Sequence, residues 1–243
     1  MKTPDYWGIS GYPISHSLTP RLFAIVGEKL NLGEIKQLFL EAKSTKEFEQ
    51  NISDLEGDLW ISITSPLKHA IRDILKLPET TIVNSINQLM RIEGEWFGAD
   101  TDGYGFVAAA KYIGIDANNS VLKIRGGGST ARSIAAAWSN SGGQIIPIQG
   151  RRKLVNGPWD QSIVKDCKAD IAVDLDAEPG GDIGQKINTK KLVSISYNEE
   201  SSIDDFAIIM LVSQHLEAWR ILFAEDKSKS LPSIEYVLEQ LFD

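Results

Sequence analysis

A glycine-rich turn between a strand-like and a helix-like segment constrains this sequence most. Val121–Arg125 has the pattern of a short strand, Gly126–Arg132 follows as GGGSTAR, and Ser133–Asn140 has helical character. Such a turn offers backbone N–H groups and the positive end of a helix dipole to a dinucleotide pyrophosphate. The strand and the helix around it make the motif more specific than its glycines alone. A plain glycine-rich connection is the alternative.

The small residues of the turn have separate expected roles. Gly126 permits the tight turn, Gly128 lets the backbone approach the phosphates, and Ala131 lets the helix pack closely on the sheet. Together with the basic pair described next, the residues expected to bind the cofactor are Gly126, Gly127, Gly128, Ser129, Thr130, Ala131, Arg151 and Arg152.

A basic pair follows the next strand-like segment, Ile145–Gln149. NAD-binding units usually carry an acidic residue here for the ribose 2′-hydroxyl, whereas this sequence has Arg151 and Arg152. Guanidinium groups suit a 2′-phosphate by bidentate contact and by stacking on adenine. We therefore expect NADP in preference to NAD. A solvated basic turn is the alternative.

Strand-like and helix-like segments alternate along the chain, which predicts an α/β fold with parallel βαβ units. Expected strands cover 6–10, 35–40, 59–63, 121–125, 145–149, 171–174 and 192–197. The first expected helix begins at Thr19–Pro20, with Thr19 as the N-cap. Further expected helices cover 66–75, 104–113, 133–140, 208–223 and 233–241.

Charge and cysteine content exclude several classes of protein. The formal net charge of −8 makes the chain a poor candidate for general nucleic-acid binding. The single cysteine, Cys167, cannot form a disulfide within the chain. No stretch resembles a signal peptide or approaches the length of a membrane span, so we expect a cytoplasmic protein without a membrane partner. His16, His69 and His215 make no metal cluster, and no metal is expected.

Polar residues mark two further segments of the first hundred residues. Ser17 and Thr19 stand two apart before a helix, where hydroxyls and helix N–H groups can bind one carboxylate. Lys68 follows Pro66 in the first turn of an expected helix, where the dipole disfavours a cation. That mismatch fits a lysine kept for chemistry. A simple N-cap and a surface lysine are the alternatives.

Six short motifs, in the same order, resemble the shikimate dehydrogenase family from Gly8 to about Phe223. The family's G-x-P-I-x-H-S-x-S-P resembles Gly11 to Pro20, and its N-V-T-x-P-x-K resembles Ser62 to Lys68. Its V-N-T-L, G-D-N-T-D-G, G-A-G-G-A-x-R and M-L-V-x-Q resemble Ile86–Leu89, Ala99–Gly103, Gly126–Arg132 and Met210–Gln214.

The resemblance implies NADP-dependent reduction of 3-dehydroshikimate to shikimate, a step of chorismate and aromatic amino acid biosynthesis. Lys68 and Asp102 would be the catalytic pair: Lys68 would transfer the proton at the reacting oxygen, and Asp102 would orient it. Substrate binding would fall to Ser17, Thr19, Thr64, Asn87, Tyr197 and Gln214. The protein would be a monomer or a homodimer.

The resemblance also implies two domains. Residues 1–101 with 214–243 would form an α/β substrate-binding domain, and residues 102–213 a Rossmann-like NADP domain. The C-terminal helices would return to the first domain.

Four departures from the family pattern bear on the substrate. Ser62 stands in place of asparagine, Asp100 in place of asparagine, and Ile209 in place of glycine; the segment from Tyr197 to Gln214 is short, with Glu199 in place of proline. Three alternatives stay open: a relative acting on quinate or an aminoshikimate, a member that binds nucleotide without turnover, and a two-domain dehydrogenase of the methylene-tetrahydrofolate type. Fold alone does not decide among them.

Overall fold

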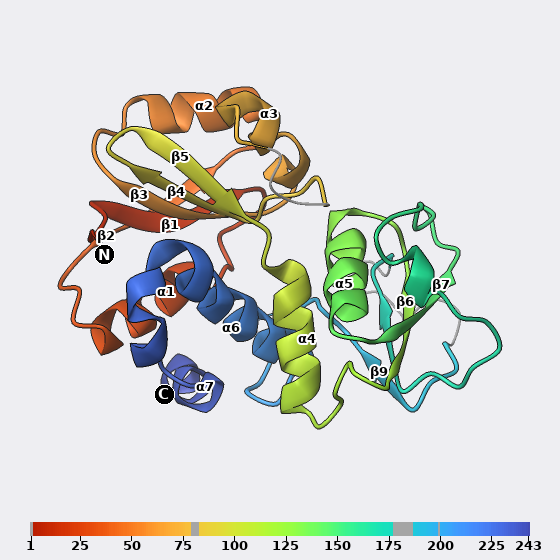
Figure 1. Cartoon of the computed structure of the whole chain (residues 1–243). Helices are drawn as coiled ribbons and strands as arrows, with labels where there is room; N and C mark the ends of the chain where they lie inside the picture. The colour runs from red at the N-terminus through yellow and green to blue at the C-terminus, as the bar shows by residue number, and fades with distance from the viewer. Residues whose placement is uncertain (1, 79–82, 177–186, 199) are drawn as a thin grey trace. The chain divides into compact units, whose positions relative to one another are not determined.

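The computed structural model describes residues 2–78, 83–176, 187–198 and 200–243. The chain forms two units: unit 1 is Met1–Thr101 with His215–Asp243, and unit 2 is Asp102–Gln214. Strands and helices alternate along the chain, so the predicted α/β class is confirmed (Figure 1).

Unit 1 is built on a five-stranded sheet in the order β2-β1-β3-β4-β5. β1, β2 and β3 run parallel, but β4 and β5 are antiparallel to their neighbours. The sequence prediction missed this hairpin, whose two-residue turn at Glu93-Gly94 has positive φ at both residues, as tight hairpin turns prefer. The strands are β1 Tyr6–Gly11, β2 Lys36–Glu41, β3 Leu59–Ile63, β4 Gln88–Ile92 and β5 Glu95–Ala99.

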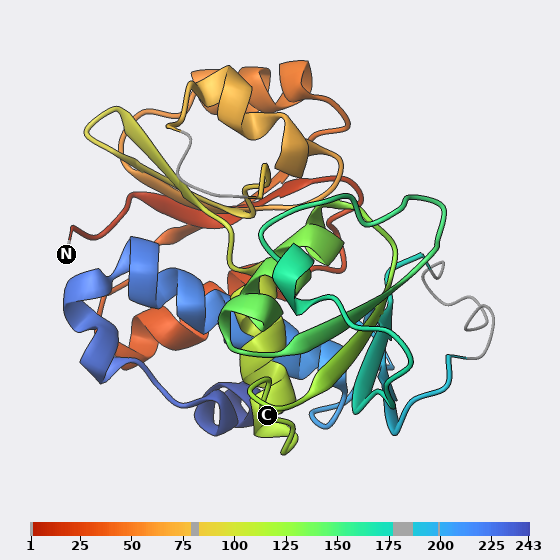
Figure 2. The same cartoon turned by 45° about the vertical axis from the view of Figure 1, so that its right-hand side comes forward.

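Helices cover both faces of this sheet: α2 and α3 lie on one face, α1 lies on the other, and α7 packs against α1 (Figures 1 and 2). α2 was not predicted, although Ser44 caps it by accepting a hydrogen bond from the backbone N–H of Glu47. The expected helix from Pro66 to Leu75 is instead a 3-10 turn, Leu67–His69, followed by a short helix, α3. The helices are α1 Thr19–Lys29, α2 Thr45–Ser53, α3 Ile71–Leu75 and α7 Ile234–Phe242.

An aromatic cluster joins the C-terminal segment of unit 1 to its sheet. The rings of Trp7 and Phe23 stack at 5.6 Å, and Trp60 stacks on Phe223 at 5.1 Å. Trp219 meets Trp60 edge-on at 5.2 Å and is fully buried. Residues after position 214 are therefore part of the core of unit 1.

Unit 2 has a four-stranded parallel sheet in the order β7-β6-β8-β9. α5 packs against β6 and β7 on one face of this sheet (Figure 2). β7 lies on one side of β6, and the next strand, β8, lies on the other side of β6. This reversal creates a topological switch point, where ligands of such sheets bind. The elements are α4 Asp102–Tyr112, β6 Val121–Arg125, α5 Ser129–Asn140, β7 Gln144–Ile148, β8 Ile171–Asp174 and β9 Lys191–Val193.

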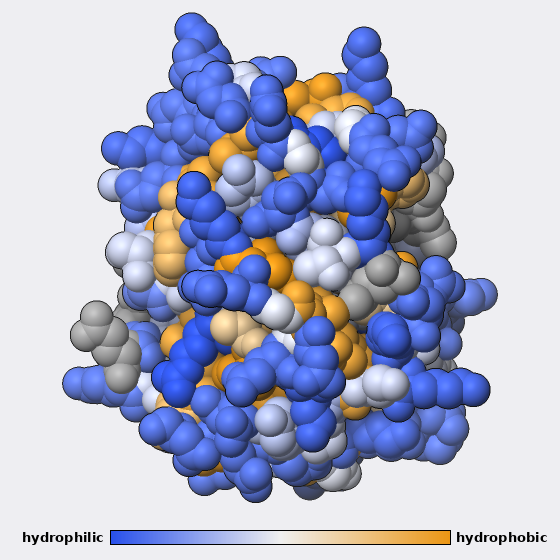
Figure 3. Space-filling view, turned by 90° about the vertical axis from the view of Figure 1, so that its left-hand side faces the viewer, coloured by the Kyte–Doolittle hydropathy of each residue, from blue (hydrophilic) through white to orange (hydrophobic). Residues whose placement is uncertain are grey.

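The helix α6, Phe206–Ala218, begins in unit 2 and ends in unit 1. A π-helical turn, Trp219–Phe223, continues it. By length and composition Phe206–Phe223 could cross a membrane, so the expectation that no segment comes near a span is wrong for this one. This segment is 67% buried inside the protein, as the core helix of a soluble protein is. The face drawn in Figure 3 is mostly hydrophilic, with smaller apolar areas between polar side chains.

Candidate functional site

The glycine-rich turn forms the start of α5. Gly126 has φ +106, a backbone conformation that favours glycine. Gly128 is the N-cap of α5, and this residue has no side chain that could cap the helix. A Cβ built on Gly128 would have nothing within 4 Å, and Ala131, in the first turn of α5, is buried. An open helix N-terminus of this kind fits a pyrophosphate, as expected for a dinucleotide site.

The basic segment packs its backbone against this turn. A Cβ built on Gly127 would lie 2.1 Å from the carbonyl oxygen of Lys153, so only glycine fits there. Arg151 and Arg152 are exposed, with 72% of the Arg151 side chain accessible. The cationic groups predicted for a 2′-phosphate therefore lie on a segment that touches the glycine turn.

Sequence reasoning missed an acidic residue in this region. Asp176 follows β8, and its carboxylate accepts a hydrogen bond from the backbone N–H of Arg151. The Arg151 Nε lies 3.9 Å from Asp176 Oδ1. No acidic residue is adjacent to the arginines in the sequence, but the fold brings Asp176 from the segment after β8 to Arg151.

A buried ion pair holds the carboxyl ends of β6 and β8 together. Arg125 Nη1 lies 2.5 Å from Asp174 Oδ2, and their side chains are only 11% and 5% accessible. The backbone N–H of Asp176 donates to the other oxygen of Asp174 at 3.1 Å. The ion pair thus also fixes the backbone that carries Asp176.

Asp102 lies beside the start of α5. It is the first residue of α4, it is 2% exposed, and it accepts a hydrogen bond from the Thr130 hydroxyl at 3.1 Å. The next residue, Gly103, donates its N–H to Ser133 Oγ at 2.8 Å. A Cβ on Gly103 would lie 2.1 Å from the Ser133 carbonyl oxygen, so glycine allows the two helices to approach. The predicted catalytic carboxylate and the predicted nucleotide turn therefore adjoin within unit 2.

In unit 1, Asn87 is fixed by a residue that the sequence reasoning did not single out. Thr101 is fully buried; its N–H donates to Asn87 Oδ1 at 2.8 Å, and its hydroxyl accepts from Asn87 Nδ2 at 3.1 Å. The motif that contains Thr101 was recognised, but no feature of the sequence indicates that Thr101 pairs with Asn87. Thr101 sets the orientation of the Asn87 carboxamide.

Ser62 is also engaged within the protein. Its hydroxyl donates to Gln88 Oε1 at 2.8 Å, and the two residues face each other across β3 and β4. This residue stands where the family has asparagine, and its hydroxyl proton is used by a neighbouring side chain. Thr64, just after β3, is half-buried, and its backbone N–H donates to Ser10.

The first helix begins one residue earlier than predicted. Leu18, not Thr19, is the N-cap of α1, and Thr19 is the first helical residue, 3% exposed. The Thr19 N–H donates to the hydroxyl of Ser17 at 3.3 Å. Because Leu18 is the N-cap, the expected N-cap role of Thr19 is wrong.

Lys68 lies in the 3-10 turn rather than in the first turn of an α-helix, so the expected mismatch with a helix dipole does not apply. Its side chain is partly buried, and its carbonyl oxygen accepts the backbone N–H of Ile86 at 3.0 Å. This bond ties the Lys68 turn to the segment that leads into Asn87.

The remaining predicted residues belong to unit 2. Gln214 is half-buried on α6, and a Cβ on Gly105 would lie 2.4 Å from its Cβ. Tyr197 is partly buried and lies beyond β9, which is shorter than predicted. Ile209 is buried within α6, and Glu199 lies outside the described residues. Ser17, Thr19, Thr64, Lys68 and Asn87 are in unit 1, and Asp102 and the cofactor residues are in unit 2.

Within the described part of the chain, no group of three or more His, Cys, Asp and Glu side chains could hold a metal ion. His16 and His69 are exposed, whereas His215 is 2% exposed inside the aromatic cluster.

Comparison with known proteins agrees with the motifs. The chain is 28% identical over 233 residues to the shikimate dehydrogenase (NADP(+)) of Oceanobacillus iheyensis, covering 90% of this chain and 82% of that protein. It is 28% identical over 203 residues to the enzyme of the same name from Crocosphaera subtropica, covering 81% of this chain and 70% of that protein. The chain is similar to curated shikimate dehydrogenases over most of its length. The resemblance inferred from the motifs is thereby confirmed.

A solved shikimate dehydrogenase shares the fold. The shikimate 5-dehydrogenase of Thermus thermophilus, solved with NADP(H) and shikimate, superposes with a TM-score of 0.74. The superposition covers 98% of each chain at 20% sequence identity. No model of a known protein family matches the chain.

Proposed function

We propose that this protein is an NADP-dependent shikimate dehydrogenase that reduces the ketone of 3-dehydroshikimate to the alcohol of shikimate. The hydrogen bond from Thr130 to Asp102 carries the proposal, because it joins a buried carboxylate to the first turn of the candidate nucleotide helix. The names of the curated relatives and the open N-terminus of α5 support the cofactor.

NADPH, when bound, supplies the hydride for the ketone carbon. The ketone oxygen gains a proton as it becomes a hydroxyl, and we assign that proton to the Lys68 ammonium. Asp102 would orient this ammonium. Hydride and proton together convert the ketone to the alcohol, so the reaction needs no further reactant.

Substrate binding is assigned to residues that suit its groups. The hydroxyls of Ser17 and Thr19 would bind the ring carboxylate. Thr64, Asn87 and Gln214, with Tyr197 beside them, would bind the ring hydroxyls. Thr101 supports this assignment for Asn87, because it fixes the carboxamide in one orientation. The assigned domains are 1–101 with 214–243 for substrate and 102–213 for NADP, in a cytoplasmic monomer or homodimer.

A related ring acid is the second candidate substrate. The bond from Ser62 to Gln88 favours it, because this hydroxyl proton is already used within the protein. Quinate and an aminoshikimate differ from shikimate in their ring substituents, and the side chain at position 62 would contact one of these substituents.

Steady-state oxidation of shikimate, quinate and an aminoshikimate, each with NADP and with NAD, tests the proposal. We expect the highest kcat/KM for shikimate with NADP. A higher value for quinate or the aminoshikimate would reassign the substrate. Absence of turnover with all three compounds, together with tight NADP binding, would make the chain a nucleotide-binding protein instead.

A further inference from the structure

Asp176 lies at the point where unit 2 is expected to bind a dinucleotide. Cβ atoms built on Gly126 and Gly150 would lie 3.2 Å from Asp176 Oδ1 and 1.8 Å from its Oδ2, respectively. These two glycines follow β6 and β7, whereas Asp176 follows β8. The carboxylate therefore reaches from β8 across the carboxyl end of β6 toward the end of β7.

This position is the topological switch point of the sheet. Dinucleotides bind there, outside the carboxyl ends of the strands, with the adenosine ribose near the end of the strand after the glycine turn. In this chain that strand is β7, and Arg151 follows it. The Asp176 carboxylate is thus a fixed negative charge at the expected place of the ribose 2′ group.

Three contacts between Asp176 and Arg151 show that the arginine is already engaged. The backbone N–H of Arg151 donates to Asp176 Oδ2, Arg151 Nε lies 3.9 Å from Oδ1, and Nη2 donates to the Asp176 carbonyl oxygen at 3.5 Å. The side chain of Asp176 is only 16% accessible. Its backbone is held through Asp174, which pairs with Arg125.

We propose that Asp176 is a specificity-determining residue that competes with the 2′-phosphate of NADP for Arg151 and so reduces the preference for NADP over NAD. The inference rests on the proposed function. A 2′-phosphate beside the carboxylate is repelled, because both are anions. A 2′-hydroxyl can instead donate a hydrogen bond to the carboxylate, as it does to the acidic residue of NAD-binding units. The two arginines alone would discriminate more strongly.

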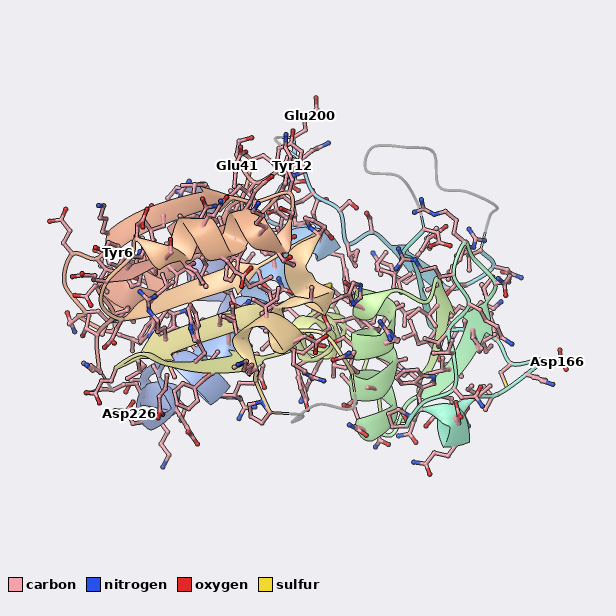
Figure 4. The ribbon with its side chains drawn as sticks, turned by 90° about the horizontal axis from the view of Figure 1, so that it is seen from above. Tyr6, Tyr12, Glu41, Asp166, Glu200 and Asp226 are labelled. Carbon is pink, nitrogen blue, oxygen red and sulfur yellow. The ribbon has the colours of Figure 1, made fainter. Side chains whose placement is uncertain are left out.

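Asp176→Asn tests the proposal, because it removes the charge and keeps the size of the side chain. Asp166→Asn is the matched control: it makes the same change of charge at an exposed aspartate of unit 2, drawn at the outer edge in Figure 4. Calorimetric titration with NADP, NAD and 2′,5′-ADP gives the dissociation constants of the original protein and both variants. Circular dichroism and a thermal melt verify that each variant is folded.

In Asp176→Asn we expect NADP and 2′,5′-ADP to bind about tenfold more tightly, the size of effect that one nearby charge gives at a partly exposed site. NAD binding should stay equal or weaken, and the gain for NADP should shrink at high salt. Asp166→Asn should match the original protein.

Weaker NADP binding in Asp176→Asn would show that the carboxylate positions Arg151 for the phosphate, and it would overturn the proposal. An unchanged ratio of the two constants would overturn it as well and leave the proposed function standing. Absence of binding of all three nucleotides to the folded original protein would refute the proposed function together with this inference.

Discussion

Thr130 has a different contact from the one expected of a residue in a nucleotide turn. The sequence placed it among the cofactor residues, and the structure shows its hydroxyl donating to Asp102 at 3.1 Å. Thr130 therefore links the first turn of α5 to the carboxylate that we propose as catalytic.

Thr130→Val should lower kcat by about tenfold, equivalent to about 1.4 kcal/mol, because Asp102 loses a hydrogen bond that orients it. The loss in kcat should exceed any change in the dissociation constant for NADP. Thr130→Ser keeps the hydroxyl and should restore most of the rate. Equal rates in Thr130→Val and the original protein would show that this bond does not serve catalysis.

His215 is a buried histidine whose charge state links stability to pH. Its Nδ1 accepts the indole N–H of Trp219 at 3.1 Å, and its Nε2 has no partner among the described residues. Burial lowers the pKa of His215 from 6.5 to about 3. The folded protein therefore keeps this ring neutral at pH values at which the unfolded chain is protonated.

The neutral His215 ring therefore contributes stability that is fully present above about pH 7. This contribution is lost as the pH falls from about 6.5 toward 3, by about 1.4 kcal/mol per pH unit. His215→Phe removes this contribution. Its free energy of unfolding in urea should fall less between pH 7 and pH 4 than that of the original protein. Equal slopes in the two proteins would refute the assignment.

The sequence predicted residues through local motifs and missed those that act across strands. The glycine turn, Lys68 and Asp102 stand in recognisable segments. Asp176 was missed because it meets Arg151 only through the order of β6, β7 and β8, twenty-five residues further along the chain. No spacing rule along a sequence reveals such a contact.

At the scale of elements, the sequence contained signals that the strand and helix predictions did not use. Ser44 and Glu47 form the S-x-x-E pattern of a helix start, and the turn at Glu93-Gly94 separates two strands. The 3-10 turn at Leu67–His69 was not predictable from periodicity, because a helix and a tight turn followed by a short helix have similar apolar spacing.

The start of α5 is the element whose glycines can be tested separately. Gly127→Ala should lower the melting temperature, because its Cβ would lie 2.1 Å from the Lys153 carbonyl oxygen and would displace the basic segment. Gly128→Ala should melt like the original protein, since its Cβ meets nothing within 4 Å. It should nevertheless weaken NADP binding, because the methyl group would cover the open helix end.

Each of these two variants adds one methyl group, at adjacent positions, so each serves as the control for the other. Equal NADP affinity in Gly128→Ala and the original protein, measured by calorimetric titration, would show that the phosphates do not bind at this helix end.

At the scale of the whole molecule, unit 1 is completed only by the end of the chain. The segment His215–Asp243 supplies Trp219 and Phe223 to a cluster that contains Trp7 and Trp60. The division into units follows this core, because residues more than two hundred positions apart share one buried cluster.

Trp219→Ala should therefore destabilise the protein by about 3–5 kcal/mol, since it opens a cavity among buried rings. Phe242→Ala is the control, because its ring is 43% exposed in the last helix of the same segment. It should change the free energy of unfolding by less than about 0.5 kcal/mol. Urea unfolding at pH 7 measures both. A small effect of Trp219→Ala would mean that the C-terminal segment adds little to unit 1.

The central claim is that the Lys68 ammonium supplies the proton while NADPH reduces 3-dehydroshikimate. The most direct test follows the loss of NADPH absorbance with this substrate in the original protein, in Lys68→Ala, and in Lys46→Ala as an exposed-lysine control from α2. We predict turnover in the original protein and in Lys46→Ala, and a loss of at least about a hundredfold in kcat for Lys68→Ala with NADP affinity retained. Turnover by Lys68→Ala at the original rate would contradict the account.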